Sequence, residues 1–234
     1  MQYEHLTPAQ CADVIDYLSE YINPDRRALL ETVLAQRTRY FTVVLEDIYQ
    51  SQNANAVVRT MECLGIQDLY VIEQNNEYQL NPGVLQGADK WLQIYRHNQA
   101  GGNNTEACLQ SLKDKGYRIA AMTLDDQSVP LEQLAIDKPT AFCFGTEEQG
   151  LTDTAQGLAD VSAKIPLYGF TRSYNVSVSA AISLYTLIAR LKASDADWQL
   201  SATEKDRLLI DWLAQSTPAG QQLLKQFLTG LGEK

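Results

Sequence analysis

The sequence has little of what a metal site, a membrane span or a secreted scaffold would need. Its 234 residues include two histidines and four scattered cysteines, Cys11, Cys63, Cys108 and Cys143, without the spacing of metal ligands. We therefore expect reduced thiols, no metal and a cytoplasmic location. No apolar stretch is long enough to span a bilayer, and the polar N-terminus MQYEHLTPAQ lacks the apolar segment of a signal peptide. No contact with a membrane is expected.

Basic residues are also scarce. Nineteen Lys and Arg face 29 Asp and Glu, and the net charge of −10 argues against a generally basic surface for nucleic acid. A local basic patch stays open, because Arg26, Arg27, Arg37 and Arg39 form the densest basic group of the chain. Composition alone slightly favours a solvated helix face for them.

Two common nucleotide-binding motifs are missing. The segment FGTEEQGL at 144–151 has too few glycines for GxGxxG, and no Gly-Lys-Ser or Gly-Lys-Thr follows it. A dinucleotide-binding Rossmann site and a P-loop are therefore excluded. Gly145 still permits a tight turn between strand and helix and the close approach of a ligand to the backbone.

Apolar runs of strand type alternate with helical stripes along the chain. We expect strands at 41–45, 69–72, 117–124, 140–144 and 161–167, a further one at 91–95, and helices between them. This alternation predicts an α/β fold with a mostly parallel sheet and helices on both faces. Helical extensions are expected on either side of the main domain, which gives three parts: residues 1–37, 38–193 and 194–234, the last wrapped on the core.

The stretch from Ile165 to Arg190 organises the rest of the chain. A polar loop at 169–174 leads to Asn175, whose side chain can cap a long apolar helix. Many positions of that helix are small, so we expect it to pack against more than one neighbour, including a second copy of the chain. Strand, loop and capped helix suit a ligand site at the carboxyl end of a sheet. An ordinary capped core helix is the alternative.

Three segments in this order resemble the SpoU (TrmH) branch of the SPOUT RNA methyltransferases: NANAVVRT at 53–60, FGTEEQGLT at 144–152 and IPLYGFTRSYNVSVSAAI at 165–182. The resemblance covers residues 38–192. It extends to GADKWLQIYRH at 87–97 and to the tail 197–213, which are similar to the subgroup that methylates the 2′-hydroxyl of the D-loop guanosine of tRNA. One residue departs from the pattern, because Tyr174 stands where the family usually has leucine.

The resemblance implies a deep C-terminal trefoil knot, S-adenosylmethionine bound in it, and a homodimer whose active sites use both subunits. It places the methyl donor near Thr123, Gly145, Ile165, Leu167 and Tyr174. It places Asn53, Arg59, Glu147, Ser173 and Asn175 around the reacting ribose. We expect the RNA to be held by Arg26, Arg27, Arg37 and Arg39, with Arg172 near the active site.

The chemistry of two of these residues favours particular roles. Arg59 is the family's usual candidate for a base, but the pKa of a guanidinium is above about 12. We therefore favour a charged clamp on the 3′-phosphate or the developing alkoxide, although local desolvation could make Arg59 the base. For Asn175 we favour a helix cap over direct contact with the substrate.

The function expected is 2′-O-methylation of tRNA. The alternatives are an rRNA methyltransferase of the same family and a non-catalytic domain that binds RNA or a ligand.

Overall fold

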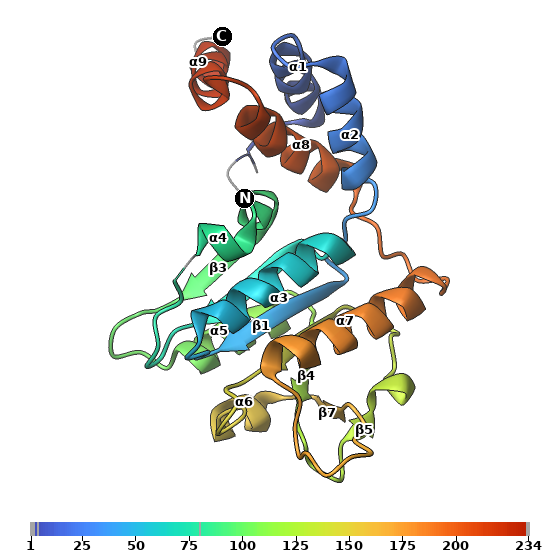
Figure 1. Ribbon diagram of the computed structural model, residues 1–234. Coiled ribbons are helices and arrows are strands. Elements are labelled where there is room, and N and C mark those ends of the chain that lie inside the picture. Colours follow the sequence, from blue (N-terminus) through green and yellow to red (C-terminus); the bar gives the residue numbers. More distant parts are fainter. Residues whose placement is uncertain (1–2, 4, 80, 233–234) are drawn as a thin grey trace. The chain divides into compact units, whose positions relative to one another are not determined.

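The chain folds into two compact units (Figure 1). The computed structural model describes residues 3, 5–79 and 81–232. One unit spans Thr38–Trp198, and the other combines Met1–Arg37 with Gln199–Lys234. The two terminal segments, which we treated as separate extensions, therefore fold together. Residues 199–232 pack with the N-terminal helices, and residues 194–198, which we assigned to the C-terminal extension, belong to the core unit.

A parallel sheet forms the centre of the Thr38–Trp198 unit. In the described part of the chain its order is β3-β2-β1-β6-β4-β7-β5, and each neighbouring pair is parallel. All six residues of β1 are buried, which explains why its apolar run Val43–Leu45 does not alternate with exposed polar residues. The two-residue strand β5 lies outside the predicted set. The strands are β1 Phe41–Glu46, β2 Asp68–Ile72, β3 Gln93–His97, β4 Arg118–Met122, β5 Val129–Pro130, β6 Thr140–Phe144 and β7 Val161–Lys164.

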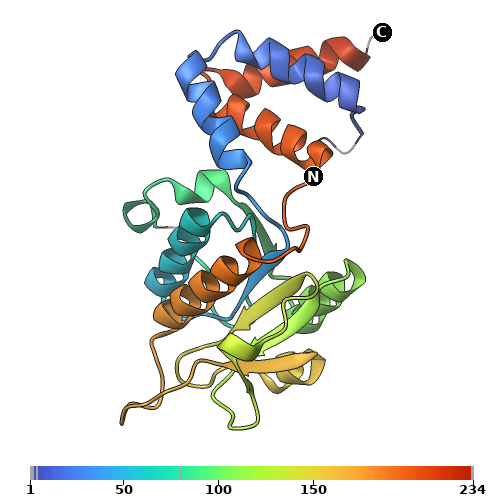
Figure 2. The same cartoon turned by 90° about the vertical axis from the view of Figure 1, so that its right-hand side faces the viewer.

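Helices cover both faces of this sheet, as Figures 1 and 2 show. On one face α3 (Ser51–Leu64) packs beside α7 (Val176–Lys192), and both bury apolar side chains against Phe41 and Val43 of β1. On the other face α5 (Asn104–Asp114) and α6 (Asp153–Leu158) cover a second apolar cluster that includes Cys108 and Cys143. The predicted fold class, a mostly parallel sheet with helices on both faces, is confirmed. Short turns at α4 Pro82–Leu85, η1 Ala88–Trp91 and η2 Leu131–Gln133 complete the unit.

The terminal unit is made of helices: α1 Pro8–Ser19, α2 Pro24–Leu34, α8 Ala202–Ser216 and α9 Gly220–Gly232. Arg37 is only 1% exposed, and its guanidinium carbon lies 5.2 Å from the ring centroid of Trp212. The stacked rings of Tyr17 and Phe227 tie α1 to α9, with centroids 4.7 Å apart. Within residues 3, 5–79 and 81–232, no helix is both long and apolar enough to cross a membrane.

Candidate active site at the carboxyl ends of the strands

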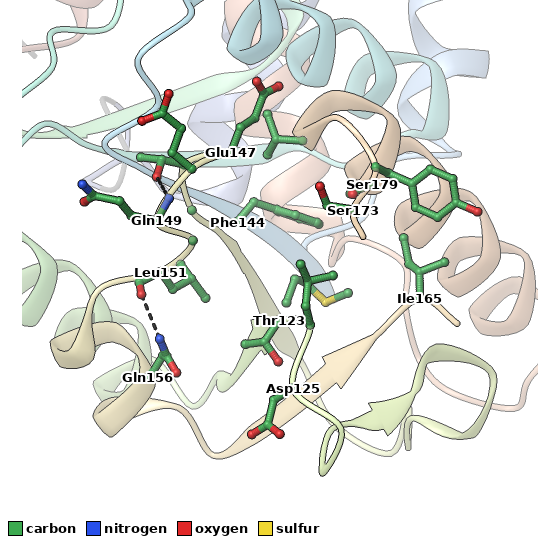
Figure 3. Close-up of a pocket in the computed structure, with 18 residues that line it drawn as sticks. Thr123, Asp125, Phe144, Glu147, Gln149, Leu151, Gln156, Ile165, Ser173 and Ser179 are labelled. Atoms are coloured by element: carbon green, nitrogen blue, oxygen red, sulfur yellow. Dashed lines mark hydrogen bonds between the residues drawn. The ribbon is translucent and has the colours of Figure 1, made fainter. Parts of the chain in front are cut away.

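A cavity of about 340 Å³ lies where β4, β6 and β7 end (Figure 3). Because the strands are parallel, the loops that follow them meet at one edge of the sheet, which is the usual place for a ligand in an open α/β fold. The segments 122–125 and 144–151 line it together with Ile165, Ser173 and Tyr174. Its size is at the lower end of the range for small-molecule sites.

The loop after β6 forms one wall of this cavity. Thr146 and Gly150 exchange two backbone hydrogen bonds, each of 3.0 Å, and close the loop on itself. A Cβ atom on Gly145 would lie 2.1 Å from the carbonyl oxygen of Gly150. We expected Gly145 to leave room for a ligand, but it is the backbone of its own loop that approaches too closely for a side chain.

Glu147, in the same loop, joins the three segments that the sequence singled out. Its Oε1 accepts a hydrogen bond from Asn53 Nδ2 at 2.8 Å and another from Asn175 Nδ2 at 2.5 Å. Asn175 Nδ2 also lies 3.2 Å from Asn53 Oδ1. One residue from each motif therefore contributes to a single polar cluster, although Asn53 and Asn175 are 122 positions apart.

Asn175 serves this cluster and its own helix at once. Its Oδ1 accepts from the backbone N–H of Ser177 at 2.9 Å and from the hydroxyl of Ser177 at 2.6 Å. This is the predicted cap of α7, which is confirmed. The amide oxygen of Asn175 thus caps α7, while the amide nitrogen donates a hydrogen bond to Glu147.

A second cavity, of about 530 Å³, adjoins the first. The two share the segment 146–149 and Val176, so Glu147 stands in the wall between them, and Asn53 lines the second. The rest of its lining comes from the loops after β1 and β2: Asp47, Ile48, Tyr49, Gln50, Asn75 and Asn76. These residues were not predicted from the sequence. Their position directly after two buried strands was the one signal that pointed to them.

Asp47 fixes the loops around this second cavity. Its Oδ1 accepts backbone N–H groups of Gln74, Asn75 and Asn76 at 3.1, 2.7 and 2.8 Å. Burial alone would raise the pKa of Asp47, but these backbone bonds and the side chain of Asn75 bring it below its ordinary value. The residue also has a φ of 55°, a left-handed conformation that aspartate tolerates better than most residues.

Four of the five residues predicted to hold the cofactor line one cavity. Thr123, Gly145, Ile165 and Tyr174 line the first cavity, together with the predicted ribose-site residues Glu147 and Ser173. Leu167 is not among the described residues that line either cavity.

Arg59 does not reach the polar cluster of its own chain. Its side chain is exposed, and its Nη1 donates to the carbonyl oxygen of Val84 at 3.2 Å. It is absent from the described lining of both cavities.

The predicted basic group for RNA is divided by the fold. Arg26 is exposed on α2, Arg27 is ion-paired with Glu31 at 3.0 Å, and Arg172 is exposed in the loop before α7. The other two serve the protein's own structure. Arg37 is buried against Trp212, and Arg39 pairs with Asp68 at 3.0 Å and donates to Gln93 at 2.6 Å. Our expectation that Arg37 and Arg39 face RNA therefore does not fit the structure.

The described lining of the first cavity has acidic side chains. Asp125, Glu147 and Glu148 contribute to its wall, and none of the described lining residues is Lys or Arg. In the part of the chain that the structure describes, no group of three or more His, Cys, Asp or Glu could hold a metal ion. The four cysteines are free thiols.

Comparison with known proteins gives consistent similarities. The model of the SpoU rRNA Methylase family matches residues 40–185. The chain is 43% identical over 201 residues to the tRNA (guanosine(18)-2'-O)-methyltransferase of Borreliella burgdorferi, covering 86% of this chain and 90% of that protein. It is 30% identical to the enzyme of the same name from Thermus thermophilus, covering 80% and 95%.

Solved structures are similar as well. The A. aeolicus TrmH/SpoU tRNA modifying enzyme matches with a TM-score of 0.72 at 29% identity, over 82% of this chain and 96% of that one. The SpoU methyltransferase AviRb from Streptomyces viridochromogenes, in complex with AdoMet, matches with a TM-score of 0.56 at 19% identity, over 70% and 62%. The second likeness concerns the fold alone.

Proposed function

The chain belongs to the SpoU methylase family, and on that premise we propose that it methylates the 2′-hydroxyl of a guanosine in tRNA with S-adenosylmethionine as donor. Membership implies the C-terminal trefoil knot that was expected from the sequence. The relatives named above act on guanosine 18, which supports that nucleotide as the target. The observation that carries the proposal is the cluster in which Asn53 and Asn175 donate to Glu147, a residue that lines both cavities.

The first cavity fits the methyl donor in chemistry. S-adenosylmethionine carries a positively charged sulfonium, and an acidic wall without Lys or Arg among the described lining residues favours a cation. Apolar side chains of Leu124, Phe144 and Ile165 suit the faces of an adenine ring. Thr123, Gly145 and Tyr174 would complete the site, and Leu167 would follow in the same loop as Ile165. When bound, S-adenosylmethionine supplies an electrophilic methyl group.

The polar cluster orients the acceptor ribose. Glu147 accepts hydrogen bonds from both amide nitrogens and so fixes the side chains of Asn53, in α3, and Asn175, which caps α7. The N–H groups of both amides are used within the cluster and by Gln50, so ribose hydroxyls would donate to the remaining lone pairs of the amide and carboxylate oxygens. The hydroxyl of Ser173 lies in the neighbouring wall. The 2′-hydroxyl must lose its proton as it attacks, and water accepts it in this proposal, because a guanidinium could act as the base only with a strongly lowered pKa.

Arg59 acts in the site of a second subunit. Its exposure, and its hydrogen bond to Val84 instead of to the cluster of its own chain, support this arrangement. The α7 surface supports a homodimer, because Val178 and Tyr185 are 44% and 68% exposed on a helix rich in small residues. Across such an interface the guanidinium stabilises the developing alkoxide or clamps the 3′-phosphate.

Phosphate contacts from Arg26 and Arg27 on the helical unit, and from Arg172 beside the cavity, hold the tRNA. A tRNA substrate and free thiols support a cytoplasmic location.

The test is incubation of the protein with methyl-labelled S-adenosylmethionine and bulk RNA from a strain that lacks this modification. Label should enter the tRNA size class and disappear with Glu147→Ala. Label in ribosomal RNA alone would favour the rRNA alternative. No label in any RNA, with S-adenosylmethionine bound, would favour the non-catalytic alternative.

A further inference from the structure

Tyr49 is an exposed aromatic residue beside the polar cluster. Its side chain is 79% exposed, although it lies only three positions after the end of β1. It lines the second cavity together with Asn53 and Glu147. Because the ring of Tyr49 is exposed to solvent beside the cluster, it is available to contact a ligand. Bases of single-stranded RNA stack on exposed aromatic rings of this kind.

The backbone that carries Tyr49 is held in place. Asp47 accepts the three backbone N–H groups described above, and Asn75 Nδ2 adds a fourth bond to its Oδ2 at 2.8 Å. Asn76 Nδ2 donates to the carbonyl oxygen of Asp47 at 3.0 Å, and Asp47 N donates to Ile72 O at 2.9 Å. A non-glycine residue at φ 55° persists when its surroundings fix it in this way, and such residues gather at functional sites. The loop therefore presents Tyr49 with little ordering left to occur on binding.

The arrangement of the two cavities indicates which part of the substrate meets Tyr49. In a nucleotide the ribose joins the base on one side to the phosphates on the other. If the 2′-hydroxyl faces the first cavity across the cluster, the base of the same nucleotide extends away from that cavity. The second cavity lies on that side, shares Glu147 with the first, and is about 530 Å³ in volume.

We propose that the second cavity binds the base of the acceptor nucleotide and that Tyr49 stacks on it. This proposal rests on the proposed function, because it assumes a ribose at the polar cluster. Stacking is tolerant of base identity, so Tyr49 contributes affinity, and the choice of guanine comes from other contacts. Tyr49 is a substrate-binding residue in this account and takes no part in proton transfer.

The test compares Tyr49→Ala and Tyr49→Phe with the wild type on two tRNA transcripts, one intact and one with an abasic ribose at the acceptor position. Gln52→Ala is the control, because Gln52 is exposed on the same turn of chain but does not line either cavity in the described structure. Binding is measured as Kd by fluorescence anisotropy, and methyl transfer as kcat and KM on the intact tRNA.

Tyr49→Ala should weaken binding of intact tRNA about 5-fold to 100-fold, as expected for the loss of one stacked base, and should act mainly on KM. Tyr49→Phe and Gln52→Ala should stay within about 2-fold of the wild type, since phenylalanine keeps the ring. On abasic tRNA the wild type and Tyr49→Ala should bind equally, because the partner of the ring is gone.

An equal loss for Tyr49→Ala on both transcripts would overturn the proposal, and so would a Tyr49→Phe variant as weak as Tyr49→Ala. Neither result would touch the proposed function, which is tested separately by whether the wild type methylates tRNA and where the methyl group is found. Calorimetric titration with S-adenosylmethionine should give the same Kd for all four proteins.

Discussion

Asn175 combines two roles that substitution can separate. Its Oδ1 caps α7 through Ser177, and its Nδ2 holds Glu147. Aspartate caps a helix about as well as asparagine, so Asn175→Asp should keep the cap. It would also place a carboxylate where an amide nitrogen now lies 2.5 Å from Glu147 Oε1. Repulsion between the two carboxylates would then open the polar cluster without unfolding the helix.

The two substitutions should differ in their effect on thermal stability but not in their effect on methyl transfer. Loss of the helix cap in Asn175→Ala should lower the free energy of unfolding by about 1 kcal/mol, which lowers Tm by about 2–4 °C in a chain of this length. Asn175→Asp should stay within about 1 °C of the wild type. Hydrogen bonds to a charged group contribute about 1.5–3 kcal/mol when removed, so both variants should lose methyl transfer by about tenfold or more.

The assay pairs thermal unfolding with kinetics of methyl transfer to tRNA. Asn103 provides the matched control, because its side chain caps α5 by accepting from Glu106 N at 3.1 Å. Asn103→Ala should lower Tm by a similar amount and leave kcat unchanged. Full activity in Asn175→Asp would show that methyl transfer does not need the bond between Asn175 and Glu147.

Three further predictions concern the partner subunit, the RNA and acid. Arg59→Ala and Glu147→Ala should each be inactive alone but recover about a quarter of wild-type activity when co-expressed as random dimers, since half of the dimers then hold one intact site. No recovery would mean that both residues serve the same protomer. The double variant Arg26→Ala, Arg27→Ala should weaken tRNA binding. It should also reduce the slope of log K against log salt concentration by up to about one for each phosphate that the variant no longer neutralises. An unchanged slope would mean that the RNA binds elsewhere. Asp47→Ala should lower the free energy of unfolding, measured with urea at pH 7, by about 1–3 kcal/mol. The pKa of Asp47 is lowered in the fold, so its contribution to the free energy of unfolding is complete above about pH 4 and falls as the carboxylate is protonated. The difference in unfolding free energy between Asp47→Ala and the wild type should therefore shrink in acid. A difference that stays constant with pH would contradict this.

Local features of the fold could be predicted because short-range chemistry determines them. The run Phe41–Leu45 specifies a buried strand, and Asn175 before an apolar helix specifies a cap. The parallel sheet followed from the alternation of such elements. The resemblance to the SpoU family supplied the knot, which the pattern of hydrophobic residues cannot encode.

Long-range contacts were beyond the sequence pattern. The burial of Arg37 depends on Trp212, which lies 175 positions later, and this contact converts an expected surface arginine into a core residue. Arg39 is similar, because its partner Asp68 belongs to another strand. The composition showed a dense basic group but could not show which side chains point inward. Tyr49 was missed because a single aromatic residue after a strand carries no motif.

Locating the methyl group is the most direct test of 2′-O-methylation in tRNA. An unmodified tRNA transcript is incubated with the protein and S-adenosylmethionine, digested with a guanosine-specific and a nonspecific nuclease, and analysed by mass spectrometry. A second transcript carries 2′-deoxyguanosine at the target position. We predict a single 2′-O-methylguanosine in the D-loop of the first transcript and none in the second. A methyl group on a base, or on any ribose outside the D-loop, would contradict it.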